Sequence, residues 1–176
     1  MSTRSALAKK IPIPAPGSIN GGLHSPHNGH VRALLRLPES KTTKDLLVTM
    51  NVGPWKVTGL KPFLLVLQKI FLKIEKERHD LWLYINTAGC LANRKQRGSD
   101  TLISNHAWGI AIDLFFGNEV TPRGSGLTEQ GLLDLYHYFH EEKIYWGAEF
   151  PTDDAMHWEA STELLEEWRV EEVLWQ

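Results

Sequence analysis

Histidine and carboxylate side chains recur in two short stretches of the chain. Residues 104–113 contain His106 and Asp113, and residues 153–159 contain His157. Two imidazoles and one carboxylate fill three positions of a tetrahedral zinc ion and leave the fourth open, as in catalytic zinc sites. Zinc lowers the pKa of water at that position towards about 7 and polarises a scissile carbonyl. The residue types alone leave hydrolysis at zinc as one option among several.

The spacing within the first stretch predicts which side chains share a face. In a strand over 110–115, Ile110 and Ile112 point into the core and Asp113 points to the opposite face. His106 precedes this strand and is expected to fold back over the exposed face. Gly109 leaves room for close approach by a ligand or by a neighbouring segment. The stretch therefore brings an imidazole and a carboxylate together.

Hydrolysis also needs a general base and a cation for developing negative charge. Asp154 lies three residues before His157, so it reaches the same site only from a turn, which the surrounding Pro-Thr-Asp-Asp sequence favours. Asp153 is the alternative base. Arg94 and Arg97, in an upstream loop, are candidates to hold an oxyanion or a substrate carboxylate, although a solvated basic loop is the simpler interpretation.

Both stretches resemble a known family. Residues 104–113, S-N-H-A-W-G-I-A-I-D, resemble the SxHxxGxAxD signature of the zinc D-alanyl-D-alanine carboxypeptidase and L-alanyl-D-glutamate endopeptidase family, which includes phage endolysins. Trp146-Gly147, Phe150 and the D-x-x-H-x-E of 154–159 resemble its closing motif. Many members have Glu where this chain has Asp154, whereas phage endolysin-like members can have Asp. The resemblance therefore favours the endolysin-like branch.

The resemblance implies a role for each of these residues. The ligands of one Zn²⁺ would be His106, Asp113 and His157. Asp154 would be the catalytic base. Arg94, which is followed by Gly98 in the family's R-x-x-x-G spacing, would contact substrate or oxyanion, with Arg97 as the alternative. Contacts to the substrate or behind the ligands are expected from Ser104, Trp108 and Glu159. Trp146 and Trp158 are expected, with Trp108, to wall the cleft.

The implied activity is hydrolysis of amide bonds in peptidoglycan stem peptides. The bond is that of a D,D-carboxypeptidase or of an L-Ala-D-Glu or D,D-endopeptidase, as in a phage lysin or an exported antibacterial effector. Two alternatives stay open: a cytoplasmic D-Ala-D-Ala dipeptidase, and a non-catalytic zinc-stabilised module that binds cell wall or peptide. A delivery machinery and an immunity protein are the expected partners of an exported form.

The composition of the chain excludes several other classes of function. The 176 residues are 42% hydrophobic with a net charge of -2, so no basic field attracts nucleic acid or an anionic membrane. Cys90 is the single cysteine, which excludes an internal disulfide. Because residues 1–10 lack the apolar stretch of a secretory signal, we expect synthesis in the cytoplasm and action on the wall only after lysis or export. No apolar run is long enough for membrane insertion.

The order of elements predicts an α+β fold. Residues 1–30, rich in Gly and Pro, are expected to form an extended or flexible N-terminal arm, and 31–176 a single zinc peptidase domain. Helices are predicted over 62–79, over 129–142 with Thr128 as N-cap, and from Ser161. Strands are predicted over 81–86, 110–115, 144–146 and 156–159. A small, mainly antiparallel sheet follows, with helices on one face and a zinc cleft on the other. The resemblance implies the Hedgehog/D,D-peptidase fold. Four further tryptophans are expected to be structural: Trp55, Trp82, Trp168 and Trp175.

Overall fold

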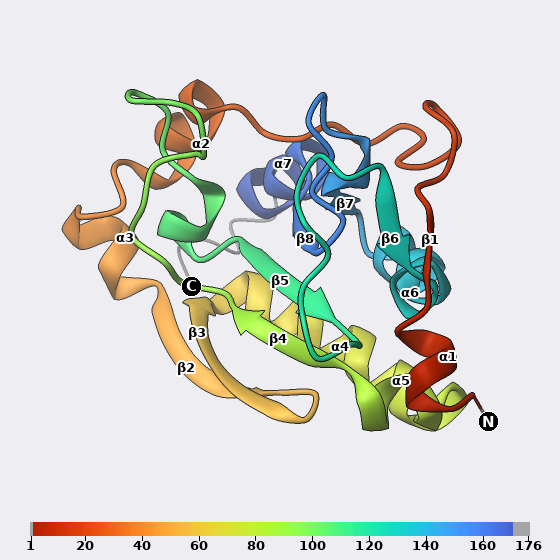
Figure 1. Cartoon of the computed structure of the whole chain (residues 1–176). Coiled ribbons are helices and arrows are strands. Elements are labelled where there is room, and N and C mark those ends of the chain that lie inside the picture. The colour runs from red at the N-terminus through yellow and green to blue at the C-terminus, as the bar shows by residue number, and fades with distance from the viewer. Residues whose placement is uncertain (1, 171–176) are drawn as a thin grey trace.

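A four-stranded antiparallel sheet lies at the centre of the molecule (Figure 1). The computed structural model describes residues 2–170 of the chain, so Trp175 lies outside the described residues. The strand order is β4 (Asn86–Gly89), β5 (Ala111–Phe115), β8 (His157–Ala160) and β7 (Ile144–Trp146). Asp113 pairs with His157 and Ala111 with Glu159 across β5 and β8. Paired residues emerge on the same side of a sheet, so Asp113, His157 and Glu159 share one face.

Helices cover the opposite face of this sheet. Ile112 of β5 and Trp158 of β8 are fully buried there. Helix α6 (Gln130–Glu141) packs on them, with the Phe139 ring centroid 4.6 Å from that of Trp158, and α4 (Lys61–Glu77) lies behind, with Phe71 5.9 Å from Phe139. The predicted α+β class with a small antiparallel sheet is confirmed.

Helix α4 fits the prediction, but the element that follows it does not. The apolar run 81–86 was predicted as a strand, whereas α5 (His79–Tyr84) is helical and β4 begins only at Asn86. Leu81 and Ile85 are buried, whereas Leu83 between them is 54% exposed. The buried positions are thus four residues apart, as on a helix, and a short apolar run does not by itself distinguish the two structures.

The predicted N-cap of α6 is also wrong. Thr128 lies within β6 (Leu127–Glu129), which pairs with β1 (Lys10–Pro12), and Glu129 is the residue that precedes the helix. The Glu129 carboxylate accepts hydrogen bonds from the Phe116 and Gly117 amides at 2.6 and 3.1 Å instead of capping α6. By contrast, Ser161 precedes α7 (Thr162–Val170) as predicted, and its hydroxyl accepts from the Leu164 amide at 3.1 Å.

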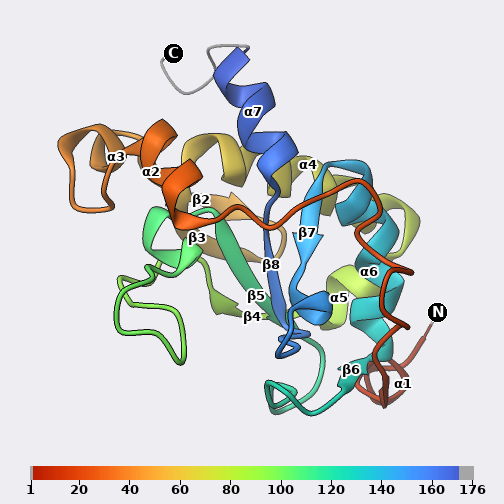
Figure 2. The ribbon, with the colours of Figure 1, turned by 90° about the horizontal axis from the view of Figure 1, so that it is seen from above.

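Residues 2–30 lie against the rest of the chain. After α1 (Arg4–Leu7) and β1, the segment passes β7 and β8 on its way to α2 (Asn28–Leu35) (Figure 2). Asn20 donates to the Trp146 carbonyl at 2.9 Å and accepts from the Trp146 amide at 2.8 Å. The side chain thereby satisfies both backbone groups of a β7 residue, as a paired strand would.

The remaining elements complete the fold around the sheet. They are α3 (Lys41–Asp45), the hairpin of β2 (Leu47–Val52) and β3 (Trp55–Leu60), and the 3₁₀ turns η1 (Asn105–Trp108) and η2 (Gly147–Glu149). Within residues 2–170, the helices are too short or too polar to cross a membrane.

Gly109 joins η1 to the strand that follows and touches β3. Its φ is +68°, and its carbonyl accepts from the Leu60 amide at 2.9 Å. A Cβ on Gly109 would lie 2.7 Å from the Leu60 nitrogen and 2.8 Å from the Gly59 Cα. The expected close approach of a neighbouring segment is therefore present, and the segment is backbone of β3.

Replacement of Gly109 by alanine is expected to destabilise the fold strongly. The positive φ costs about 1–2 kcal/mol, and the overlap with β3 backbone should bring the total to roughly 3 kcal/mol or more. Urea unfolding measures the change. Gly126→Ala is the matched control, because Gly126 also has φ +68° but no neighbour within 4 Å of the added Cβ. Equal losses in the two variants would show that the contact with β3 is unimportant.

Candidate metal centre

Three side chains from separate elements meet at one point. His106 Nε2 lies 3.1 Å from Asp113 Oδ1 and 3.2 Å from His157 Nδ1, and the last two atoms are 3.3 Å apart. His106 comes from η1, Asp113 from β5 and His157 from β8. The structure thus brings together the three residues that the sequence suggests as metal ligands, and all three are buried.

The other ring nitrogens fix which atoms point to this centre. His106 Nδ1 lies 2.7 Å from the Cys90 carbonyl, which can only accept, so Nδ1 carries the hydrogen and Nε2 presents a lone pair. His157 Nε2 lies 2.7 Å from Glu159 Oε2, which leaves a lone pair on His157 Nδ1 in the same way. When both imidazoles are neutral, their two lone pairs and the Asp113 carboxylate converge on one point.

A divalent cation fits this donor set. Ligand atoms about 2.0–2.1 Å from a tetrahedral zinc ion lie about 3.3 Å from one another, and the observed separations are 3.1 to 3.3 Å. One carboxylate and two nitrogen ligands suit zinc. The outward hydrogen bonds from both histidines are those that orient metal-bound imidazoles.

A proton competes with a cation for the same lone pairs. Burial alone lowers the pKa of the His157 imidazole, but hydrogen bonds with Asp113 and Glu159 outweigh it and raise the pKa to about 10. Burial also opposes ionisation of Asp113, yet its contacts with the two histidines lower the pKa of this carboxyl below its ordinary value. Metal binding should therefore displace a proton from the centre.

Glu159 connects His157 to the N-terminal segment. Besides His157, its carboxylate accepts from the Ser25 hydroxyl at 2.5 Å and from the Asn105 side-chain amide at 2.8 Å. Burial favours the neutral form of Glu159, but these hydrogen bonds outweigh it and lower its pKa. Glu159 lies where the sequence suggests a residue that orients a ligand.

Asp154 lies in a turn before His157, as the spacing requires, and lines the same cleft as His157. Its carbonyl accepts from the His157 amide at 3.0 Å, and its amide donates to the Gly147 carbonyl at 2.9 Å. A Cβ on Gly147 would lie 2.8 Å from the Asp154 carbonyl oxygen and 3.1 Å from the His157 Cβ, which explains the glycine after Trp146 in the second motif. Burial raises the pKa of Asp154, whose buried Oδ1 has no hydrogen-bond partner within residues 2–170. This is the environment of a carboxylate that can exchange protons.

A cleft of about 310 Å³ opens beside the centre. His106 and Asp113 are 2% and 8% exposed and do not line it, whereas His157 belongs to both the centre and the cleft. The other sequence-suggested residues in the lining are Arg94, Arg97, Ser104, Asp154 and Glu159. The volume is at the lower end of the range for ligand pockets, about 300–1,000 Å³, and suits a short peptide segment.

The tryptophans do not wall this cleft. Trp108 is fully buried and donates to the Arg36 carbonyl at 2.9 Å. Trp146 and Trp158 pair across β7 and β8 on the helix-covered face, with ring centroids 4.8 Å apart, because they alternate with the cleft-facing residues. Trp146 also donates to the Ala155 carbonyl at 2.7 Å and so supports the turn before His157. Phe150 lines the cleft instead, with its ring 5.5 Å from that of His157.

Asn105, Ser25 and Arg123 are among the cleft residues that the sequence did not suggest. Asn105 lies inside the first motif at a position the motif leaves free. Ser25 comes from the N-terminal segment and Arg123 from a loop before β6, and both line the cleft. Neither has a local pattern that connects it to the motifs, because its place depends on long-range packing.

One comparison with known proteins gives a match. A family model described as D-alanyl-D-alanine carboxypeptidase matches residues 97–160. This segment includes His106, Asp113, Asp154 and His157, but it leaves out Arg94 and Ser25. No curated protein and no solved structure matches the chain.

Zinc is expected to raise the melting temperature of the protein, because a ligand that binds only the folded state stabilises it. His106→Ala should abolish this shift, whereas His137→Ala, at an exposed position on α6, should retain it. Differential scanning calorimetry with and without one equivalent of zinc measures the effect. An unchanged zinc shift in His106→Ala would place the metal elsewhere.

Glu159→Gln is expected to weaken zinc binding by about 10–100-fold, the usual effect of losing a partner behind a histidine ligand. Ser25→Ala should weaken it less, because Asn105 still donates to Glu159. Competition with a fluorescent chelator gives both dissociation constants. Wild-type affinity in Glu159→Gln would mean that the carboxylate does not support His157.

Proposed function

We propose that this protein is a zinc-dependent peptidase that hydrolyses amide bonds in D-alanine-containing peptides of bacterial cell walls. The observation that carries the proposal is the convergence of donor atoms from His106, Asp113 and His157 beside Asp154, whose buried Oδ1 has no hydrogen-bond partner within residues 2–170. The match of residues 97–160 to the carboxypeptidase family supports the substrate class.

The proposed mechanism divides the work between the centre and the cleft. His106, Asp113 and His157 would hold a zinc ion, which would supply Lewis acidity and lower the pKa of water. Asp154 takes a proton from the attacking water and returns it to the departing amine. Because burial raises the pKa of Asp154, the protonated carboxyl forms more readily than at an exposed aspartate. Glu159 keeps the His157 ring in the orientation that presents Nδ1.

The arginines of the cleft would bind negatively charged groups of the substrate. Arg94 and Arg97 lie in the lining with Ser104, and a guanidinium binds a carboxylate through two parallel hydrogen bonds. Arg94 would contact the terminal carboxylate of a carboxypeptidase or dipeptidase substrate, or the oxyanion in an endopeptidase. An endolysin or an exported wall-degrading effector is the setting we propose for the endopeptidase form.

A non-catalytic binding module is the rival from another class. Three ligands suffice to hold a structural or substrate-binding metal, so such a module has no need of Asp154. A buried carboxylate oxygen without a partner costs stability, on the order of 1–3 kcal/mol for an unsatisfied polar group. Its retention beside the centre favours a catalytic role.

Digestion of purified peptidoglycan by the zinc-loaded protein tests the proposal. Fragments released with and without a chelator are identified by mass spectrometry. New termini that vanish with the chelator support a metallopeptidase, and their identity separates carboxypeptidase from endopeptidase cleavage. A folded, zinc-loaded protein that cuts neither several wall types nor the dipeptide D-Ala-D-Ala would overturn the proposal.

Asp154→Asn is expected to lower turnover by about 10²–10⁴-fold, the usual contribution of a general base, while zinc affinity stays the same. Asp45→Asn, a change to an exposed carboxylate on α3, is the control and should keep full activity. Turnover is read by the release of D-alanine or of a new amino terminus. Full turnover in Asp154→Asn would assign the base to another residue, with Asp153 the first to test.

A further inference from the structure

Three arginines from two loops line the cleft. Arg94 and Arg97 belong to the loop between β4 and η1, and Arg123 to the loop between β5 and β6. Within residues 2–170, none of the three forms an ion pair with a carboxylate of the protein. This surplus of positive charge is local, because the whole chain has a net charge of -2.

The carboxylates of the cleft do not neutralise these cations. Glu159 is already engaged by His157, Ser25 and Asn105. Asp154 is the other carboxylate in the lining, and burial raises its pKa, although the charges of His157, Arg97 and Arg123 oppose this. Cations from both loops therefore line the same cleft as this side chain.

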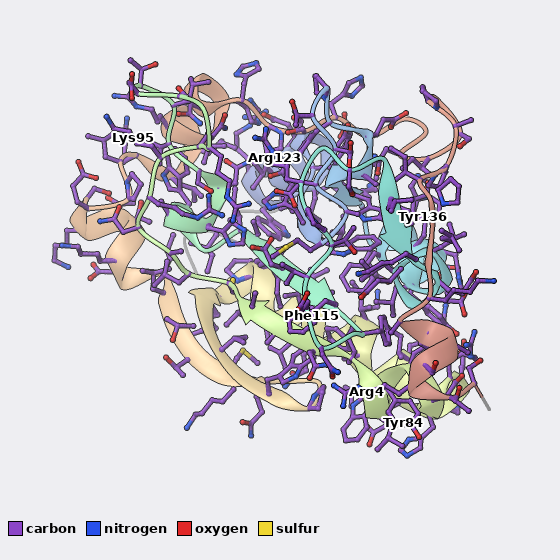
Figure 3. All side chains as sticks on the ribbon, viewed as in Figure 1. Arg4, Tyr84, Lys95, Phe115, Arg123 and Tyr136 are labelled. Atoms are coloured by element: carbon purple, nitrogen blue, oxygen red, sulfur yellow. The ribbon has the colours of Figure 1, made fainter. Side chains whose placement is uncertain are left out.

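Backbone contacts fix the loop that carries Arg123. The Gly124 amide donates to the Asp153 carbonyl at 2.7 Å, and the Gly126 amide lies 3.2 Å from an Asp153 carboxylate oxygen. The loop that carries Arg123 is thereby attached to Asp153, the residue next to Asp154. Figure 3 labels Arg123 on this loop and Lys95 on the loop that also carries Arg94.

The opposite loop is anchored independently. The Arg94 carbonyl accepts from the Ser104 amide at 3.0 Å, and the Gln96 amide donates to the Leu102 carbonyl at 2.8 Å. The Asn28 side chain binds both backbone groups of Ile103, at 2.8 and 2.6 Å. The two groups of cations thus stand on separately fixed supports, and one small carboxylate would leave part of this charge unpaired.

We infer that the cleft selects peptides with two carboxylate groups, one bound by Arg94 and Arg97 and the other by Arg123. The second group would be an acidic side chain next to the residue at the scissile bond. This inference rests on the proposed function, which identifies the ligand as a peptide. Arg123 is then a specificity-determining residue from a loop that carries neither of the two motifs.

Two synthetic peptides test this inference. Both end in D-alanine, and they differ only in having Glu or Gln at the residues that precede this D-alanine. Binding of each peptide to the zinc-loaded full chain is measured by calorimetry, and cleavage is followed separately. We expect the acidic peptide to bind about two- to fivefold more tightly, with a preference that declines as salt screens the exposed guanidinium. Arg123→Gln should remove the preference without weakening binding of the neutral peptide.

Lys95→Gln is the matched control, because Lys95 is an exposed cation of the neighbouring loop that does not line the cleft. It should keep the wild-type preference. Equal binding of the two peptides by the wild type, or an equal loss for both in Arg123→Gln, would overturn the inference. Preferential binding of the acidic peptide without cleavage would support this inference and count against the peptidase proposal. Cleavage of both peptides without a preference would support the peptidase proposal and overturn this inference.

Discussion

The register between β5 and β8 is the constraint on which the site depends. It sets Asp113 opposite His157 and Ala111 opposite Glu159, so that two candidate metal ligands, Asp113 and His157, and the carboxylate that binds His157 emerge on one face. A shift of one residue would turn His157 and Glu159 towards α6 and expose Trp158 instead. The burial of Ile112 and Trp158 against Phe139 opposes such a shift, and the apolar core thereby holds the polar centre in place.

The sequence predicts the parts of the site that depend on local patterns. Alternation along 110–115 places Asp113 opposite the core, and the three-residue spacing of Asp154 and His157 requires the turn that the structure contains. Gly109 has the close backbone approach that the sequence suggests, and the structure adds Gly147 of the second motif, where backbone also approaches too closely for a side chain. The candidate metal ligands follow from the residue types, which leave zinc as one option among several, and from the family resemblance.

Local patterns fail where a distant contact decides the outcome. The run 81–86 has strand-forming residues, yet residues 81–84 belong to helix α5, and only Asn86 belongs to a strand. Thr128 has the chemistry of a cap, yet pairing with Ile11 draws it into a strand. Trp108 lies within the first motif and is expected at the cleft, but it is buried in the core and donates a hydrogen bond to the Arg36 carbonyl. Ser25 and Arg123 reach the cleft through contacts that short windows of sequence do not contain.

The bond between Ser25 and Glu159 has a consequence for how the protein is made. The two residues are 134 positions apart, and Glu159 supports a histidine that itself lies 51 positions from His106. Contacts of such separation form late in folding, because loop closure must precede them. Among the strands within residues 2–170, β8 is the last to be synthesised, so the centre cannot assemble before His157 and Glu159 have been added to the chain. The order of synthesis therefore keeps the nascent protein without a complete site until the whole four-stranded sheet has been translated.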